Sequence, residues 1–193
     1  LFALETTEPF YKKSEKKSEK IITLVPGSRM SEVKRLLPLM REVVDMLYRN
    51  GCMGYKFVIP VVETTKDYVM AQVSKWRVKP DLVSARDRYD VYAKSYLAIV
   101  ASGTVSAELA MLHIPTIVVY KMNPITMWIG RRIINVKWVS LINILLNKSV
   151  FPELLGADAR AENIVNAVQQ LAIPSVREKM VRVYEEMYGV NPE

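Results

Sequence analysis

The sequence is poor in the residues that build disulfide-stapled or metal-dependent proteins. Its 193 residues include one cysteine, Cys52, and one histidine, His113. A lone cysteine cannot form a disulfide within the chain, which excludes a disulfide-rich extracellular scaffold and favours a reducing cytoplasm. A lone histidine excludes a metal centre built on paired histidines and argues against a Ser-His-Asp triad. We therefore expect no metal site built on such residues.

Long apolar runs are also missing. No uninterrupted apolar stretch approaches the ~20 residues that a membrane-spanning helix needs. The composition, with 50% hydrophobic and 24% charged residues, is otherwise that of a globular domain. A chain of this length buries roughly 70% of its unfolded surface on folding, which is enough for a sizeable core. These features exclude a disordered tail and a fibrous repeat.

Positive charge is in excess. The chain has 27 Lys and Arg against 20 Asp and Glu, a net charge of +7, which favours an anionic partner such as a phosphate, a nucleic acid or an acidic membrane surface. Part of the excess is local, because residues 12–20 hold five lysines and two glutamates. We interpret residues 1–20 as a charged linker or a remnant of an interdomain region. The chain begins at Leu1, and we expect it to be a piece of a longer protein.

Apolar runs and amphipathic segments alternate after residue 20. We expect strands over 21–25, 56–60, 81–84, 96–101 and 115–120. We expect helices over 30–48, 66–75, 89–94, 105–112, 161–171 and 174–188. Pro38 should kink the first helix or mark a boundary in it, and Gly51 should end it. Alternating strands and helices predict an α/β fold, with a Rossmann-like parallel sheet covered by helices on both faces over residues 21–173.

Two strand–turn–helix loops are candidates for a binding site. Pro26-Gly27-Ser28-Arg29 follows the first strand, and Ser102-Gly103-Thr104 follows the fourth. In open α/β sheets, ligands bind beyond the carboxyl ends of the strands, where helix N-termini present free N–H groups. Each loop offers a glycine and a hydroxyl, and Arg29 can make a forked contact with phosphate. Together they predict a diphosphate site, although Ser and Thr are also ordinary helix caps and Gly an ordinary turn residue.

Glu108 adds to the second loop. It lies one turn into the helix that follows Thr104, on the face that looks back toward the loop. A carboxylate there can accept hydrogen bonds from both hydroxyls of a ribose. The alternative is a favourable negative charge near a helix N-terminus.

Five motifs, in order, resemble the C-terminal half of the lipid-A-disaccharide synthase family over residues 21–171. They are LVPGSR with Glu32 and Val33 at 24–33, ASGT with Glu108 at 101–108, PTIVVYKMNP at 115–124, VSLIN at 139–143, and PELL at 152–155. Ile142 and Gly156 depart from the proline and the glutamine that the family usually has at these places.

The resemblance implies the C-terminal half of a GT-B glycosyltransferase, which has its active site between two Rossmann-like halves. Such an enzyme transfers a diacylated glucosamine from UDP to diacylglucosamine 1-phosphate with inversion, without a metal or another cofactor, and releases UDP. Arg29 and Asn143 would have electrostatic or positioning roles in catalysis, with the general base in the N-terminal half. The implied UDP-binding residues are Gly27, Ser28, Arg29, Ser102, Gly103, Thr104, Glu108 and Asn143. This chain would bind the nucleotide but not catalyse transfer by itself.

The implied partners are the UDP-diacylglucosamine donor, the diacylglucosamine 1-phosphate acceptor and a membrane, but no nucleic acid. The implied location is the cytoplasm, peripherally on the inner membrane of a Gram-negative bacterium, and a homodimer is left open. A basic and aromatic stretch fits contact with anionic lipid, unless its tryptophans are core residues. It holds Trp128, Arg131, Arg132, Lys137 and Trp138. The last helix, 174–193, could cross to the N-terminal half and be poorly anchored here.

Two alternatives stay open. The first is another GT-B enzyme that uses UDP-N-acetylglucosamine, such as a peptidoglycan transferase or an epimerase. The second is a basic binding module without chemistry. Among smaller features, we interpret Cys52 as structural and His113 as a helix cap or a favourable charge at a helix C-terminus. The stretch Arg86-Asp87-Arg88 either borders the uracil or forms a surface ion pair.

Overall fold

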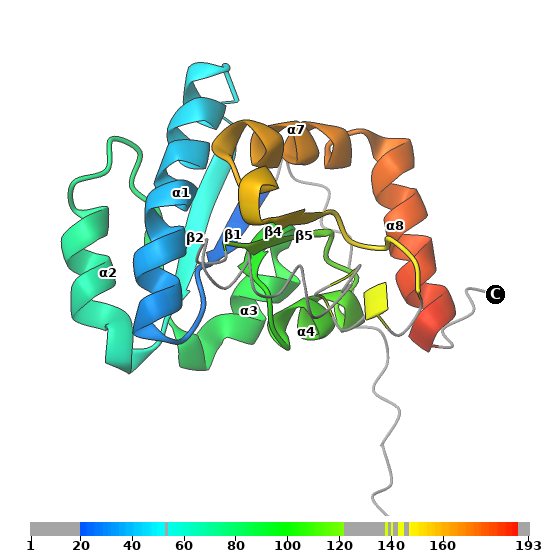
Figure 1. Cartoon of the computed structure of the whole chain (residues 1–193), viewed down its shortest axis with the longest axis horizontal. Coiled ribbons are helices and arrows are strands. Elements are labelled where there is room, and N and C mark those ends of the chain that lie inside the picture. Colours follow the sequence, from blue (N-terminus) through cyan, green and yellow to red (C-terminus); the bar gives the residue numbers. More distant parts are fainter. Residues whose placement is uncertain are drawn as a thin grey trace, which may run out of the picture.

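The strands form one parallel sheet in the computed structural model, which describes residues 20–52, 54–121, 138, 140, 143–144 and 147–188 (Figure 1). Within these ranges the sheet has six strands in the order β3-β2-β1-β4-β5-β6, and every neighbouring pair is parallel. The strands are β1 (Lys20–Val25), β2 (Tyr55–Val61), β3 (Asp81–Ser84), β4 (Ser95–Ala101), β5 (Thr116–Tyr120) and β6 (Glu153–Leu155). The predicted Rossmann-like α/β fold is confirmed, and β6 is a strand that the sequence did not predict.

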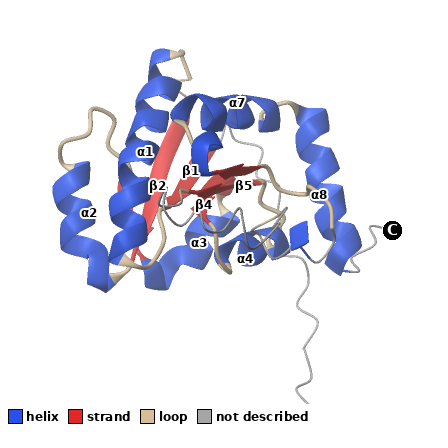
Figure 2. Cartoon of the chain, viewed as in Figure 1, coloured by secondary structure: helices blue, strands red, loops and turns tan. Residues whose placement is uncertain are grey.

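Helices cover both faces of the sheet, as predicted. They are α1 (Met30–Arg49), α2 (Lys66–Val73), α3 (Arg88–Ala93), α4 (Val105–Met111), α7 (Ala161–Leu171) and α8 (Pro174–Tyr188). Three short 3₁₀ turns, η1 (Glu63–Thr65), η2 (Ala85–Asp87) and η3 (Gly156–Asp158), join them to the strands. In Figures 1 and 2, α1 and α7 lie over one face, with α2 beside α1, while α3 and α4 lie under the other. In the described residues, no helix is both long and apolar enough to cross a bilayer.

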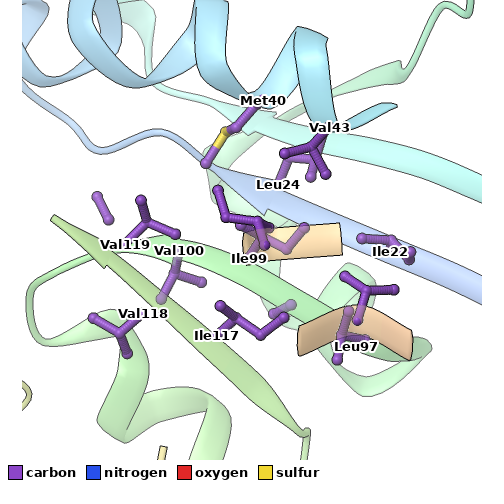
Figure 3. Close-up of a cluster of buried hydrophobic side chains, with 14 of the residues drawn as sticks. Ile22, Leu24, Met40, Val43, Leu97, Ile99, Val100, Ile117, Val118 and Val119 are labelled. Atoms are coloured by element: carbon purple, nitrogen blue, oxygen red, sulfur yellow. The ribbon is translucent and has the colours of Figure 1, made fainter. Parts of the chain in front are cut away.

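The core lies between the sheet and its helices. Met40 and Val43 of α1 lie over Leu24 of β1, and the fully buried β-branched residues of β4 and β5 continue the layer (Figure 3). Their burial explains why these strands are continuous apolar runs, since a parallel sheet covered on both faces has no solvent side. The core therefore fixes the positions of β1 and β4, the two central strands.

Helix α1 passes through Pro38 without a boundary. Pro38 is exposed, on the opposite side from the buried face of the helix. The carbonyl that loses its hydrogen bond to the proline can therefore turn to water. Gly51 ends α1, as predicted, with a φ of +78° and a hydrogen bond from its N–H to the carbonyl of Tyr48.

Helix α8 is anchored on this domain. Its apolar positions recur at helical spacing, and Met180 and Tyr184 are buried. The ring centroid of Tyr184 lies 5.5 Å from that of Phe151. Arg177 donates a hydrogen bond to the Tyr96 carbonyl and stacks on the Tyr96 ring, with its Cζ 4.3 Å from the centroid. These contacts hold α8 on the described part of the domain, and its crossing to an N-terminal half stays a prediction. Of the expected linker 1–20, only Lys20 lies among the described residues, and it begins β1.

Candidate functional site

The order in which the strands are added to the sheet reverses between β1 and β4. After β1 the chain proceeds through α1 toward β2 and β3, whereas after β4 it proceeds through α4 toward β5 and β6. The loops that follow β1 and β4 therefore leave toward opposite faces and open a crevice at the carboxyl edge of the sheet. A pocket of about 460 Å³ lies in this crevice.

Both predicted loops line the pocket. Seven of the residues that the sequence proposed for nucleotide binding meet there: Gly27, Ser28, Arg29, Ser102, Gly103, Thr104 and Glu108. The lining also includes Glu32, Arg88 and Tyr92. The sequence had given none of these three residues a defined role in binding. Of the predicted site residues, Asn143 is not part of the lining.

The loop between β1 and α1 is held in place by Glu32. Gly27 has a φ of +106°, and a Cβ there would lie 2.4 Å from Oε2 of Glu32, so only glycine fits. The same oxygen accepts a hydrogen bond from the N–H of Arg29 at 3.3 Å, one half of a capping box. The Arg29 guanidinium lies 3.5 Å from Glu32 Oε1, yet its side chain is 82% exposed. Because such an exposed pair contributes little energy, Arg29 can turn to an anionic ligand at small cost.

The loop between β4 and α4 is joined to the sheet by a backbone hydrogen bond. The N–H of Ser102 donates to the carbonyl of Val119 at 3.2 Å and so belongs to the sheet. Thr104 makes no side-chain capping bond to α4, which counts against the alternative that it is only a cap. A Cβ on Gly103 would meet nothing within 4 Å. The Gly103 backbone is therefore open to close approach by a ligand.

Glu108 forms an ion pair with Arg88 at the wall of the pocket. Nε of Arg88 lies 3.4 Å from Oε2 of Glu108, so α3 and α4 are joined at the pocket wall. Tyr92 lies beside them and is 1% exposed. Burial raises the pKa of Tyr92 well above its usual value, and the negative charge of Glu108 raises it further. For residues 86–88 the sequence left two alternatives, a border of the uracil or a surface ion pair. Arg88 forms an ion pair, and its partner Glu108 lines the pocket.

Asn143 is not among the residues that line this pocket, and its expected place near the donor stays a prediction. The residue is fully buried. Its Oδ1 accepts hydrogen bonds from the N–H groups of Val150 and Phe151 at 2.7 and 3.0 Å. Its Nδ2 donates to the Phe151 carbonyl at 3.0 Å and to Oε1 of Glu153 at 2.7 Å. The amide is thus occupied in holding residues 150–153 to the segment that carries Asn143.

Other predicted features lie elsewhere. Trp138 is half-buried, and the rest of the basic and aromatic stretch 128–138 lies outside the described residues. His113 adopts a φ of +55° after α4, with its N–H bonded to the Ala110 carbonyl and that of Ile114 to the Leu109 carbonyl. This arrangement is a Schellman motif, so the prediction of a helix cap is confirmed. In the part of the chain that the structure describes, no group of three or more His, Cys, Asp or Glu side chains could hold a metal.

The signal that left Arg88 open as a border of the uracil could also have associated Tyr92 with the site. Both residues follow β3, whose carboxyl end lies at the same edge of the sheet as those of β1 and β4. Residues just beyond parallel strands share that edge. The pairing of Arg88 with Glu108 had no such signal, since it joins two helices across 20 residues of sequence.

Comparison with known proteins identifies sequence relatives. The family model described as lipid-A-disaccharide synthetase matches residues 4–188, a longer stretch than the motifs at 21–171. A lipid-A-disaccharide synthase of Paramagnetospirillum magneticum is 37% identical over 154 residues, which cover 79% of this chain and 39% of that protein. A lipid-A-disaccharide synthase of Myxococcus xanthus is 38% identical over 170 residues, which cover 87% of this chain and 44% of that protein. The chain thus spans about two-fifths of the length of these relatives.

Solved structures support the fold. The UDP-GlcNAc 2-epimerase of Neisseria meningitidis, solved bound to UDP-GlcNAc, matches with a TM-score of 0.54 and 15% sequence identity. The match covers 85% of this chain and 38% of that one. At this identity, the likeness establishes the shared fold.

Proposed function

The chain belongs to the lipid-A-disaccharide synthetase family, and from that membership we propose that it is the UDP-sugar-binding half of an inverting glycosyltransferase. The complete enzyme would join UDP-2,3-diacylglucosamine and 2,3-diacylglucosamine 1-phosphate into lipid A disaccharide 1-phosphate and release UDP. One observation carries the proposal for this half. Two loops with the composition of a diphosphate site, and a carboxylate suited to a ribose, line a single pocket at the sheet's switch point.

The chemistry of the pocket suits a leaving diphosphate. Arg29 is exposed, and among the described residues it is held only by a weak ion pair, so its guanidinium can contact phosphate oxygens. Gly103 leaves room for a phosphate against the backbone of the second loop. Donors at these positions stabilise the charge that develops on UDP as the glycosidic bond to the sugar breaks. In this proposal Ser28, Ser102 and Thr104 supply further hydrogen bonds, and Glu108 accepts the ribose hydroxyls.

The steps that we assign to this chain and to the rest of the enzyme follow from the length of the chain. It spans about two-fifths of its relatives, and the acceptor site and the general base would lie in the remaining part. We therefore expect this chain to bind UDP without transferring the sugar.

We also propose contact with the inner-membrane surface, supported by the acylated substrates and by the basic and aromatic sequence at 128–138. A homodimer stays a prediction that light scattering can test.

Calorimetric titration of this chain with UDP and ADP tests the proposal. We expect saturable binding that is selective for UDP. Glu108→Ala should weaken it roughly tenfold to a hundredfold, because it removes charge-assisted contacts worth ~1.5–3 kcal/mol. Glu162→Ala, on an exposed part of α7, is the matched control and should bind as the parent chain does.

Other outcomes would favour the alternatives. Equal binding of UDP and ADP, insensitive to Glu108→Ala, would contradict a uridine-nucleotide site. Weak binding with a steep salt dependence and no nucleotide selectivity would instead indicate a basic binding module.

A further inference from the structure

We propose that Arg88 is a positioning residue, which holds the carboxylate of Glu108 in the orientation that accepts a ribose diol. The inference rests on the proposed function, since it takes a nucleotide as the ligand of this pocket. It adds a residue that acts by orienting Glu108 and not by contacting the ligand.

The Arg88 guanidinium is itself fixed. Each of its three nitrogens has its own partner: Nε lies 3.4 Å from Glu108 Oε2, Nη1 donates to the Ala85 carbonyl at 3.2 Å, and Nη2 donates to the Tyr89 hydroxyl at 3.0 Å. Its Cζ also lies 4.3 Å from the centroid of the Tyr89 ring. A planar group held in three directions and stacked on a ring has little freedom to turn toward a ligand. Arg88 therefore differs from the exposed Arg29, whose guanidinium pairs with Glu32 alone in the part of the chain that the structure describes.

Glu108 is engaged on one side only. Oε2 faces Arg88, whereas Oε1 has no hydrogen-bond partner among the described residues. The side chain is 29% exposed and lines the pocket. One oxygen is thus fixed while the other remains available to accept hydroxyl groups, which is the arrangement that diol recognition needs.

Without Arg88, Glu108 would have a competing position. It lies in the first turn of α4, where the free N–H groups of the helix attract a carboxylate. Those N–H groups directly follow the Ser102-Gly103-Thr104 loop, which would bind the diphosphate. By holding Glu108 on the side of α3, Arg88 keeps a negative charge from the phosphate positions and directs it at the ribose.

A double-mutant cycle tests the proposal on this chain. UDP and 2′,3′-dideoxy-UDP, which offers no hydroxyl to Glu108, are titrated into the parent chain, Arg88→Met, Glu108→Gln and the double variant. We expect Arg88→Met to weaken UDP roughly five- to thirtyfold while changing dideoxy-UDP little. In the Glu108→Gln background, Arg88→Met should have no further effect on UDP.

Two further variants complete the design. Arg86→Met changes an exposed arginine of the same segment outside the pocket lining, and it should bind both ligands as the parent chain does. Arg88→Lys keeps the charge but cannot hold three partners at once, so it should lose most of the UDP affinity that Arg88→Met loses. Thermal unfolding of each variant confirms that it is folded, and the lysine variant carries the test if the methionine variant is not.

Five results would overturn the proposal. Equal weakening of both nucleotides, or a loss that persists with Glu108→Gln, would mean that Arg88 acts on the phosphates. Full affinity in Arg88→Lys would mean that charge suffices without positioning. If the parent chain binds no UDP, the proposed function falls and this inference with it, whereas UDP binding that depends on Glu108 and not on Arg88 removes this inference only.

Discussion

Asn143 donates a hydrogen bond from Nδ2 to Oε1 of Glu153 at 2.7 Å, and the same carboxylate oxygen accepts the N–H of Ser140 at 2.9 Å. The pair links the segment that carries Asn143 to β6 at the edge of the sheet. Because buried polar groups are costly when unpaired, this contact has a structural role that precedes any role in binding.

Replacing Asn143 should therefore reduce stability first. Asn143→Ala removes four hydrogen bonds and leaves buried partners unsatisfied, which should lower the free energy of unfolding by about 2–4 kcal/mol. Urea unfolding measures the change. Asn166→Ala, on an exposed position of α7, is the control and should change stability by less than about 0.5 kcal/mol. A fully stable Asn143→Ala that has lost UDP affinity would contradict this assignment and return the residue to the donor site.

The two loop glycines should respond differently to a methyl group. In Gly27→Ala the new Cβ meets Glu32 at 2.4 Å in a left-handed conformation, so stability should fall by about 1–3 kcal/mol and UDP binding should weaken. In Gly103→Ala the Cβ enters open space, so stability should stay near that of the parent chain while UDP binding weakens. Thermal unfolding combined with titration separates the two effects. Parent-like UDP affinity in Gly103→Ala would show that no ligand approaches that backbone.

His113 is a site where stability can be gained. It is a non-glycine residue at a φ of +55° after α4, a conformation that costs most L-residues about 1 kcal/mol. His113→Gly should raise the free energy of unfolding by roughly 0.5–1 kcal/mol, measured by urea unfolding. The reverse change, Gly51→Ala, meets no atom within 4 Å but keeps a φ of +78°, so it should lose about 1 kcal/mol. A loss of stability in His113→Gly would indicate that the imidazole makes a contact that offsets its conformational cost.

Tyr92 should make the chain less stable at alkaline pH. Its pKa is raised in the folded protein, first by burial and then by Glu108, from a usual value near 10. Below pH 10 the phenol is neutral in both states and adds no pH dependence. Above pH 10 the unfolded chain loses this proton first, so the free energy of unfolding falls as pH rises.

The measurement is urea unfolding at pH 9 and pH 11. Tyr92→Phe should lose less stability between these values than the parent chain, because its ring has no proton to release. An identical loss in both proteins would show that Tyr92 ionises as easily in the folded state as in the unfolded state.

The sequence predicted the framework of the domain well. Strands β1, β2, β4 and β5 lie within two residues of their predicted bounds, because each is a buried apolar run bounded by turn residues. The two loops of the pocket followed from the same pattern, since the residue after a parallel strand must lie at the carboxyl edge of the sheet. Seven of the eight proposed nucleotide-binding residues line one pocket for this reason.

What the sequence could not predict depends on contacts between side chains far apart in the chain. The ion pair of Arg88 with Glu108 spans two helices, and the anchoring of α8 depends on Tyr184 meeting Phe151. Asn143 was placed at the pocket by resemblance, yet its bonds with residues 150–153 arise only when that segment folds back. The three-residue β6 is too short to show a period, and only its pairing with β5 defines it.

The order of the elements has a consequence for synthesis of the chain on the ribosome. All residues that line the pocket lie between Val25 and Glu108, whereas α7, which packs on α1, begins at Ala161. The walls of the pocket thus emerge from the exit tunnel well before α7, the helix that packs on α1. A nascent chain at that stage exposes the hydrophobic surface that α7 later covers, until α7 has been translated.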